Sequence, residues 1–269
     1  MILAIDIGNT TVTLGGVRTA PQQAYSLEFT ARIDINHTWS ASQYESAIEQ
    51  LFEDKNLSPS DFRGVIISSV VPSVLTLLQE CVRNLFGTEP LLVTSESDLG
   101  MTFSIPEPEK VGRDRLVDAA WAAAHYPLPV ITVDLGTATT FNVVDENRVF
   151  RGGVICPGLS TGLRALGERC AQLPQVHLGS PKSAIGTNTE KCMLSGSVMG
   201  TAVLIDGMVQ RIEEELGQSA TLVVTGGLAK YVAPLCRHPL TYDPELLMKG
   251  LALLYQLNAP QPAPRHTAA

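Results

Sequence analysis

The feature that most constrains this chain is an internal repeat. The stretch "AIDIGNTTVT" begins at Ala4 and "TVDLGTATTF" begins at Thr132, and each contains an aspartate, an aliphatic residue, a glycine and then threonines. The two aspartates, Asp6 and Asp134, lie about half the chain length apart. Because a duplication fixes the architecture before any local detail, the repeat predicts two similar halves. The alternative is coincidence, since short turns of this composition are common.

The predicted elements follow the same order on both sides of the repeat. Apolar periodicity and turn residues predict strands at 2–7, 11–17, 25–33, 64–70, 90–94, 129–134, 139–145, 148–151 and 220–225. They predict helices at 42–55, 73–86, 159–171, 190–216, 228–235 and 245–257. Asn147 suits the turn between the last two strands of the second set of three. The sequence therefore predicts an α/β protein with two βββαβα halves, 1–114 and 115–257, facing each other across a cleft, and a flexible tail at 258–269.

Composition and charge narrow the class of protein. Hydrophobic residues make up 45% of the chain, charged residues 17%, and the net charge is −8. This composition is typical of a globular protein, and it disfavours nucleic-acid binding, which requires a basic surface. The five cysteines include no CxxC pair, which indicates reduced thiols and no zinc site. With no signal peptide and no uncharged run of membrane-spanning length, we expect a cytoplasmic protein that does not bind membranes.

The two repeated turns have the composition of phosphate sites. A glycine-containing turn between strands leaves backbone N–H groups free to bind phosphate oxygens, and threonine hydroxyls add further donors. An aspartate at the end of the preceding strand can hold a cation beside the phosphates. Paired glycines at Gly226 and Gly227, after another apolar strand, would let a flat ring approach the backbone. In isolation each turn is more often an ordinary hairpin, and the glycine pair a plain strand-to-helix turn.

Two glycine-bearing segments suggest sites for a substrate. The stretch "RGGVICPGLSTG" predicts a loop where a ligand passes near the backbone, or alternatively a helix entry. In "PEKVGRDRLVDAAWAAA", Gly112 precedes a strong helix-forming run, so Asp114 lies near a helix N-terminus, where anions bind. We expect Arg113 and Arg115 to keep Asp114 ionised, so that it orients a hydroxyl and accepts its proton during phosphoryl transfer. The alternative is a helix cap with surface ion pairs.

Taken together, these stretches resemble the type III pantothenate kinases, which have the duplicated fold of actin-like ATPases and ribonuclease H-like proteins. The matching motifs run in family order over residues 2–257: "DIGNTTVTLGG", "ISSVVPS", "EKVGRDRLVDAAWAA", "VDLGTATTFNVVD", "GGVICPGLSTGLRAL", "AQLPQV", "IGTNTEKCMLSGSVMG", "VVTGGLA" and "LLMKGLALLY". The resemblance implies ATP-dependent phosphorylation of pantothenate, the first step of coenzyme A biosynthesis, by a homodimer whose substrate site lies near the subunit boundary. The helix at 190–216 is the expected contributor to that boundary.

The resemblance also implies roles for individual residues. Asp114 would be the general base, and Asp134 would hold a monovalent cation, K⁺ or NH₄⁺. Asp6 would lie near Mg²⁺. ATP would be bound by the segment Asp6, Ile7, Gly8, Asn9, Thr10, Thr11, Val12 and Thr13, together with Thr137. Pantothenate would be bound by Gly112, Arg113, Asp114, Arg115 and Thr189.

Three positions depart from the family pattern. Ile105 stands where a substrate-contacting tyrosine is common, Glu107 replaces an asparagine, and Arg113 replaces a small residue. The alternatives to a pantothenate kinase are therefore a kinase or phosphohydrolase acting on another small hydroxy acid, and a non-catalytic regulatory or accessory nucleotide-binding protein.

Overall fold

The computed structural model describes residues 1–20 and 24–260. The chain forms two compact units, one comprising Met1–Leu99 and the residues from Met248 onward, the other Gly100–Leu247. This division differs from the boundary expected at residue 114, because residues 102–103 pair with a strand of the second unit and the last helix returns to the first. The expected flexible tail at 258–269 lies outside the described residues from residue 261 on.

Unit 1 is built on a five-stranded sheet with the order β3-β2-β1-β4-β5. Its strands are β1 (Ile2–Ile7), β2 (Thr11–Thr19), β3 (Tyr25–Asp34), β4 (Val65–Ser69) and β5 (Leu91–Leu92). Its helices are α1 (Ala41–Asp54), a 3₁₀ turn (Pro59–Asp61), α2 (Pro72–Phe86) and the part of α8 (Leu246–Asn258) from Met248 onward.

Unit 2 is built on a six-stranded sheet with the order β11-β10-β7-β8-β9-β6. Its strands are β6 (Thr102–Phe103), β7 (Val130–Leu135), β8 (Ala138–Val144), β9 (Val149–Pro157), β10 (Thr221–Thr225) and β11 (Thr241–Tyr242). Its α-helices are α3 (Arg113–His125), α4 (Leu159–Arg169), α5 (Thr189–Leu194), α6 (Gly200–Leu216) and α7 (Ala229–Val232). A π-helical segment (Ser195–Met199) joins α5 to α6, and 3₁₀ turns occupy Pro108–Lys110 and Ala233–Leu235.

The predicted duplication is confirmed by the strand order. In unit 1, β1 pairs antiparallel with β2, which pairs antiparallel with β3, while β4 and β5 continue in parallel on the other side of β1. In unit 2, β7 takes the place of β1, with β8 and β9 antiparallel on one side and β10 and β11 parallel on the other. Only β6, at the edge beside β9, has no counterpart among the described strands of unit 1.

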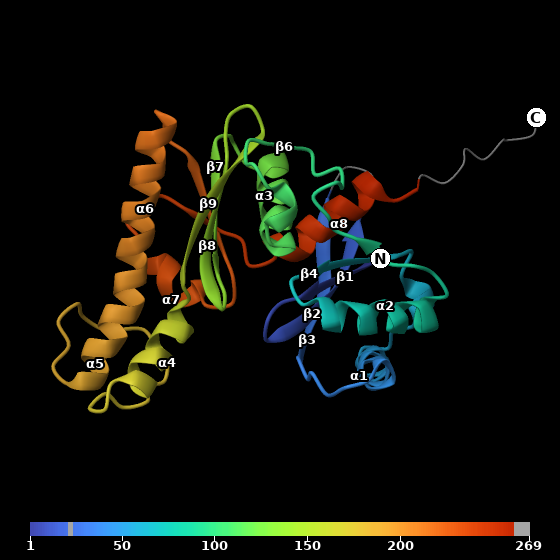
Figure 1. Ribbon diagram of the computed structural model, residues 1–269, viewed down its shortest axis with the longest axis horizontal. Coiled ribbons are helices and arrows are strands. Elements are labelled where there is room, and N and C mark those ends of the chain that lie inside the picture. Colours follow the sequence, from blue (N-terminus) through green and yellow to red (C-terminus); the bar gives the residue numbers. More distant parts are fainter. Residues whose placement is uncertain (21–23, 261–269) are drawn as a thin grey trace, which may run out of the picture. The chain divides into compact units, whose positions relative to one another are not determined.

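The sheet of unit 2 is covered on both faces. Ile131, Val133 and Leu135 of β7 point to one face, where they join a buried core with Val198, Ala202, Ile205 and Val209 of the π-helical segment and α6. Alternate residues point to the other face, where α3 packs. Figure 1 shows α3 and α6 on opposite sides of β7, β8 and β9. This arrangement leaves the N-terminus of α3 at the same face as Asp134.

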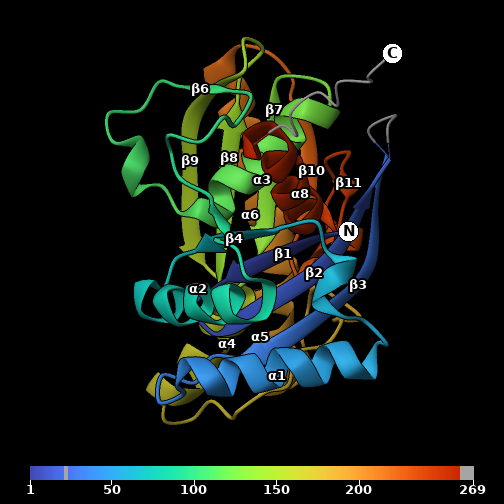
Figure 2. The same ribbon diagram turned by 90° about the vertical axis from the view of Figure 1, so that its right-hand side faces the viewer.

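The sheet of unit 1 is also covered on both faces. Tyr44 and Ile48 of α1, and Val74 and Leu78 of α2, pack with Ile5 and other apolar residues of the sheet, and Figure 2 shows both helices below the strands. The opposite face carries α8. Met248 approaches the backbone of β2 at Gly15, and Tyr255 approaches that of Gly64, just before β4.

The long helix predicted at 190–216 is in fact a run of α5, π-helical segment and α6. Over Thr189–Leu216 this run is long and apolar enough to cross a membrane by length and composition. It also carries Asp206, which accepts hydrogen bonds from the backbone N–H groups of Arg237 and His238. Its buried side chains belong to the core of unit 2, which is typical of the core helix of a globular protein.

One local prediction is corrected by the structure, and another is confirmed. The glycine-rich stretch after residue 151 forms strand β9 and then α4 rather than an open ligand loop, because Gly152 and Gly153 lie beside a bulge where β9 crosses close to β8. Asn147 lies in the turn before β9, as predicted, and donates its backbone N–H to Asp145 Oδ1. The next residue, Arg148, adopts the left-handed conformation, with φ of 59°.

Candidate active site

The N-terminus of α3 carries the predicted general base. Gly112 is the N-cap, and its carbonyl accepts the hydrogen bond from the Leu116 N–H that starts the helix. The Asp114 carboxylate folds back over this cap and accepts a hydrogen bond from the Arg115 N–H at 2.8 Å. A Cβ atom at position 112 would lie only 2.5 Å from Asp114 Oδ1, so glycine there makes room for the carboxylate.

Arg115 ties this helix end to the sheet below it. Its Nε donates to Asn142 Oδ1 at 2.7 Å, and one Nη reaches the Phe141 carbonyl oxygen at 3.4 Å. Asn142 in turn donates to Thr132 Oγ1 at 3.1 Å. The guanidinium is therefore held in one orientation by β8, and Asn142 is itself held by Thr132 of β7, which positions the neighbouring Asp114 over the sheet.

Asp134 lies on the same face of the sheet as Arg115 and Asn142. It ends β7, where it pairs with Thr140 of β8 and Thr225 of β10. Among the described residues, no group donates a hydrogen bond to its carboxylate. The one charged group among them that shifts its pKa is another acid, Asp114. The carboxylates of Asp114 and Asp134 thus lie on the same side of the sheet, and Arg115 is anchored beside Asp114.

Burial governs the charges of this cluster. Burial, and to a smaller extent the charge of Asp114, together raise the pKa of Asp134 to about 7. Burial also raises the pKa of Asp114, against the lowering effects of the Arg115 N–H and guanidinium. Burial lowers the pKa of Arg115, and Asp114 offsets part of that change. A carboxylate whose pKa lies above its usual range is a better proton acceptor than a fully solvated one.

The expectation that two arginines hold the charge on Asp114 is corrected here. Only Arg115 contributes, and its effect on the pKa is smaller than that of burial. Arg113 turns away and donates its Nη1 to the Val111 carbonyl at 3.1 Å. Helical residues two positions apart point in different directions, so one arginine of the pair reaches the sheet and the other does not.

The second repeated turn is closed against the start of α4. Gly136 donates its N–H to the Ala138 carbonyl, and Thr161 donates its hydroxyl to the Thr137 carbonyl at 2.8 Å. Gly226 lies beside this turn with φ of 97°, and a Cβ atom there would approach Asp134 Oδ1 to 2.3 Å. Gly226, the first glycine of the predicted pair after β10, therefore makes room for the Asp134 carboxylate.

The first repeated turn lies in unit 1 and has the same design. Asp6 ends β1, is 9% exposed, and pairs with Thr13 of β2 and Ser68 of β4. Gly8 donates its N–H to the Thr11 carbonyl at 3.0 Å, so this turn is one residue longer than the second. The Ser68 hydroxyl is buried without a hydrogen-bond partner among the described residues. A buried donor in that state suits a bound water or ligand.

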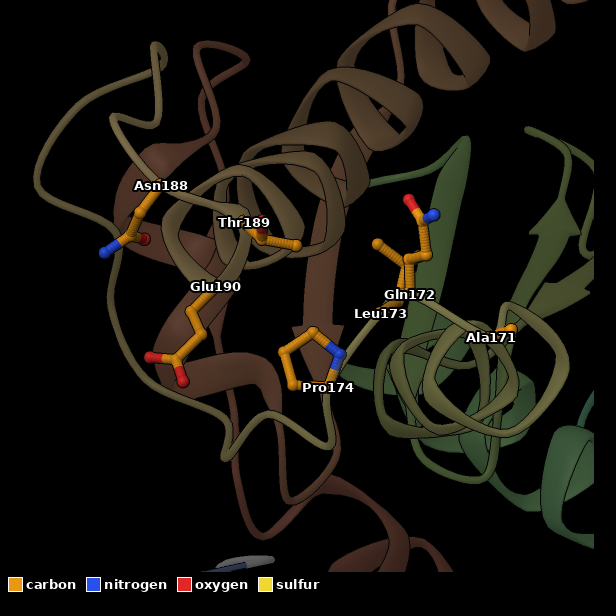
Figure 3. A pocket seen from close by; sticks show the side chains of 7 residues that line it. All are labelled: Ala171, Gln172, Leu173, Pro174, Asn188, Thr189 and Glu190. Carbon is orange, nitrogen blue, oxygen red and sulfur yellow. The ribbon is translucent and has the colours of Figure 1, made fainter.

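Thr189 is not brought together with Asp114. It begins α5, in the helical run that packs on the face of the sheet opposite α3. There it lines a pocket of about 520 Å³ (Figure 3). The pocket is lined by Ala171, Gln172, Leu173, Pro174, Asn188, Thr189 and Glu190. The segment 171–174 was not predicted as part of a site, although it belongs to the "AQLPQV" motif.

Three other positions of the candidate site have no role in the sequence-based prediction. Asn142 and Thr140 hold or flank the acids from β8, and Ile155 lies beside Thr140 on β9. The signal for Asn142 is an amide within the apolar strand "TTFNVV", where a buried polar residue needs a specific partner. Ile105 and Glu107, which depart from the family pattern, lie shortly before α3 in the chain. Glu107 forms an ion pair with Lys110.

Comparison with known proteins gives a consistent result. The family model described as type III pantothenate kinase matches residues 2–211. Type III pantothenate kinases of Exiguobacterium sp. and Bacillus cytotoxicus are 37% and 36% identical to this chain, over 96% of it and 99% and 97% of their own lengths.

Solved structures with the same fold are more distant. A conserved putative Baf family transcriptional activator from Campylobacter jejuni matches with a TM-score of 0.56 and 19% identity, over 94% of this chain and 97% of its own. A putative 2-dehydro-3-deoxygalactonokinase protein from Sinorhizobium meliloti matches with a TM-score of 0.54 and 11% identity, over the full length of both chains. At these identities the matches show the fold alone. The family model and the sequence relatives show that the chain belongs to the type III pantothenate kinase family.

Proposed function

We propose that this protein transfers the γ-phosphoryl group of ATP to the terminal hydroxyl of pantothenate, the first step of coenzyme A biosynthesis. The observation that carries the proposal is the cluster of Asp114, Arg115 and Asp134 on one face of a sheet, in a chain of this family. The five free thiols fit a reducing compartment, and we propose that the enzyme acts in the cytoplasm.

In the proposed reaction the acceptor hydroxyl lies within hydrogen-bond distance of Asp114. Its oxygen forms a bond to the γ-phosphorus as the bond from phosphorus to the β–γ bridging oxygen breaks, and ADP leaves. The hydroxyl proton passes to the Asp114 carboxylate, whose raised pKa suits this role. Arg115, held by Asn142, keeps the carboxylate in place. Positioning accounts for most of the rate in such reactions.

The first turn is proposed to bind the ATP phosphates. Its backbone N–H groups and the hydroxyls of Thr10, Thr11 and Thr13 are suitable donors, and Thr137 is proposed to touch ATP from the second turn. Asp6 is proposed to lie near Mg²⁺. The buried, unpartnered Ser68 hydroxyl opposite Asp6 supports a polar ligand at this point. Magnesium bound to ATP neutralises phosphate charge and keeps most of its water ligands, so one carboxylate is sufficient.

Asp134 is proposed to hold the monovalent cation. Its carboxylate receives no hydrogen bond from the described residues and faces the charge of Asp114. A bound cation would pair with the carboxylate and offset its repulsion with Asp114. Groups of three or more metal-binding side chains do not occur in the described part of the chain. That composition suits K⁺ or NH₄⁺, which accept carbonyl and hydroxyl oxygens as ligands, better than a transition metal.

The pantothenate end is proposed to include Gly112, Arg113 and Thr189, within a homodimer. Thr189 and Asp114 lie on opposite faces of one sheet, so Thr189 is proposed to reach the substrate of a second copy. The helical run that starts at Thr189 supports a subunit contact, because Val203 of α6 is 68% exposed although the run is apolar. Arg113 donates Nη1 to the Val111 carbonyl, and its other guanidinium nitrogens are proposed to bind the pantothenate carboxylate.

A coupled ATPase assay tests the proposal. We expect ADP release that requires pantothenate and is stimulated by K⁺ compared with choline chloride at equal ionic strength. The Asp134→Ala variant is expected to lose most of the K⁺ stimulation. Turnover without any acceptor would instead indicate a phosphohydrolase, turnover only with other small hydroxy acids a different kinase, and ATP binding without turnover an accessory protein.

A further inference from the structure

Three side chains form a row across the central strands of unit 2. Asp134 of β7 pairs with Thr140 of β8, and Thr140 pairs with Ile155 of β9. Residues directly opposite each other on neighbouring strands point to the same face, so all three lie on the α3 side of the sheet. We refer to Asp134, Thr140 and Ile155 as the open row.

The preceding row is covered by Arg115, whereas in the open row Asp134 and Thr140 are half-buried and Ile155 is exposed. Thr132, Asn142 and Gly153 form the preceding row, where Arg115 bonds to Asn142. Its guanidinium lies 3.0 Å from the place of a Cβ atom at position 153, so glycine leaves that space to the arginine. Arg115, in the first turn of α3, reaches this row, and the neighbouring Asp114 lies close enough to the open row for its charge to act on Asp134.

Ile155 is the apolar end of the open row, and it is 64% exposed. Its neighbours along β9, Val154 and Cys156, pack on the opposite face with the core of unit 2. One exposed isoleucine carries no information alone. This one lies on the same face of the sheet as Asp134, two residues along β9 from Gly153, over which the anchored Arg115 lies. The open row therefore changes from carboxylate to hydroxyl to aliphatic across three strands.

This order matches the chemistry of the proposed acceptor. In pantothenate, the carbon that bears the reacting hydroxymethyl group also bears two methyl groups. When the hydroxyl lies at Asp114, those methyls lie within a few ångströms of it, and Arg115, the chain neighbour of Asp114, lies over Gly153, two residues before Ile155 on β9. Resting on the proposed function, we propose that Ile155 is a specificity-determining residue that contacts the two methyl groups beside the reacting hydroxyl. Thr140 and Asp134 then border the polar side of the same substrate.

The test compares two acceptors. Wild-type enzyme and the Ile155→Ala variant are assayed with pantothenate and with its analogue that lacks both methyl groups. We expect the wild type to prefer pantothenate by about tenfold in kcat/KM, the scale for burying two methyl groups. In Ile155→Ala we expect that preference to fall to less than about threefold, mainly through KM for pantothenate, with KM for ATP unchanged.

Matched variants separate a contact from a general disturbance. Ile155→Val should keep most of the preference. Leu166→Ala removes an exposed aliphatic side chain from α4, on the other face of the same sheet, and should leave both substrates unaffected. Thermal unfolding of each variant checks that the fold is intact.

Two results overturn the inference while leaving the proposed function intact. One is an Ile155→Ala enzyme that keeps the wild-type preference, and the other is a variant that loses both substrates by the same factor. A wild-type enzyme that turns over neither acceptor would refute the proposed function, and this inference with it.

Discussion

Asp114 and Asp134 lie on one face of a sheet, close enough for the charge of one to raise the pKa of the other. The sequence indicates both aspartates, because each follows a recognisable turn or helix-start pattern. It does not indicate how their charges are balanced. Arg113 and Arg115 are equivalent neighbours of Asp114 in the sequence, yet only Arg115 reaches Asn142 on a distant strand. Which of the two contributes depends on packing that local patterns do not contain.

Replacing the proposed base tests its role directly. Asp114→Asn keeps the shape of the side chain but removes the proton acceptor, so we expect kcat to fall by about 10²- to 10⁴-fold. Steady-state kinetics would measure this, and ATP binding by calorimetry should be retained. Glu109→Gln, an exposed change just before α3, is the matched control and should behave as wild type. Near-normal turnover in Asp114→Asn would contradict the assignment.

We expect the buried Asp134 carboxylate to lower the free energy of unfolding when it is ionised. Its pKa in the folded protein is about 7, above the unfolded value of about 3.9, so the folded state binds more protons between these values. Stability therefore falls as pH rises through this window. Asp134→Asn removes the effect, and without K⁺ we expect it to be more stable than wild type by on the order of 2 kcal/mol at pH 8.

The measurement for Asp134 is urea unfolding in choline buffer at pH 4 and pH 8. The gain in the free energy of unfolding should shrink to near zero at the lower pH. Added K⁺ should narrow the difference at pH 8, because a ligand that binds the folded wild type stabilises it. A variant that is less stable than wild type at pH 8 would argue against this account.

At the scale of elements, strand and helix patterns were predicted well where apolar periodicity is strong. Strand β1 has the predicted bounds, and α1 and α2 each begin one residue earlier than predicted. Strand β9 was predicted too short, because glycines are typical of loops. In the structure these glycines lie beside a β-bulge and leave space above the sheet. The break in the long helix was also missed, since no proline or glycine pattern marks a π-helical segment.

That π-helical segment is positioned to hold the loop before Thr189. The buried Ser195 donates its hydroxyl to the Ala184 carbonyl at 2.6 Å. In Ser195→Ala the Ala184 carbonyl loses this partner, a cost of about 1 kcal/mol because the exposed carbonyl can bond to water instead. We expect KM for pantothenate to rise several-fold while KM for ATP stays constant, and amide exchange over 180–188 to quicken. Ser197→Ala, in the same segment, is the control and should leave both readouts unchanged.

At the scale of the whole molecule, the duplication was the most reliable prediction, because the same order of five strands recurs around both aspartates. The division of the chain between the two units was less predictable. Helix α3 follows the strands of unit 1 in the sequence but belongs to unit 2, and most of α8 follows unit 2 but belongs to unit 1. Sequence spacing does not reveal which sheet such a helix covers.

The proposed homodimer with shared sites predicts complementation between two defective variants. Asp114→Asn and Thr189→Ala each damage a different part of the same site. After subunit exchange, half of the dimers are mixed and each has one intact site, so activity should recover to about a quarter of wild type. Coupled assays before and after mixing measure this. If Thr189 acted within its own chain, mixing would restore nothing beyond the sum of the separate variants.

The return of α8 to unit 1 has a consequence for how the chain is made. Ala4 and Gly15 pair on the face of the first sheet that α8 covers, and Met248 reaches that face at Gly15. The strands of this sheet leave the ribosome early, whereas their cover emerges last. The nascent protein must therefore carry a bare apolar surface through most of its synthesis. A premature stop codon shortly before residue 248 would destabilise a sheet whose every strand had already been translated.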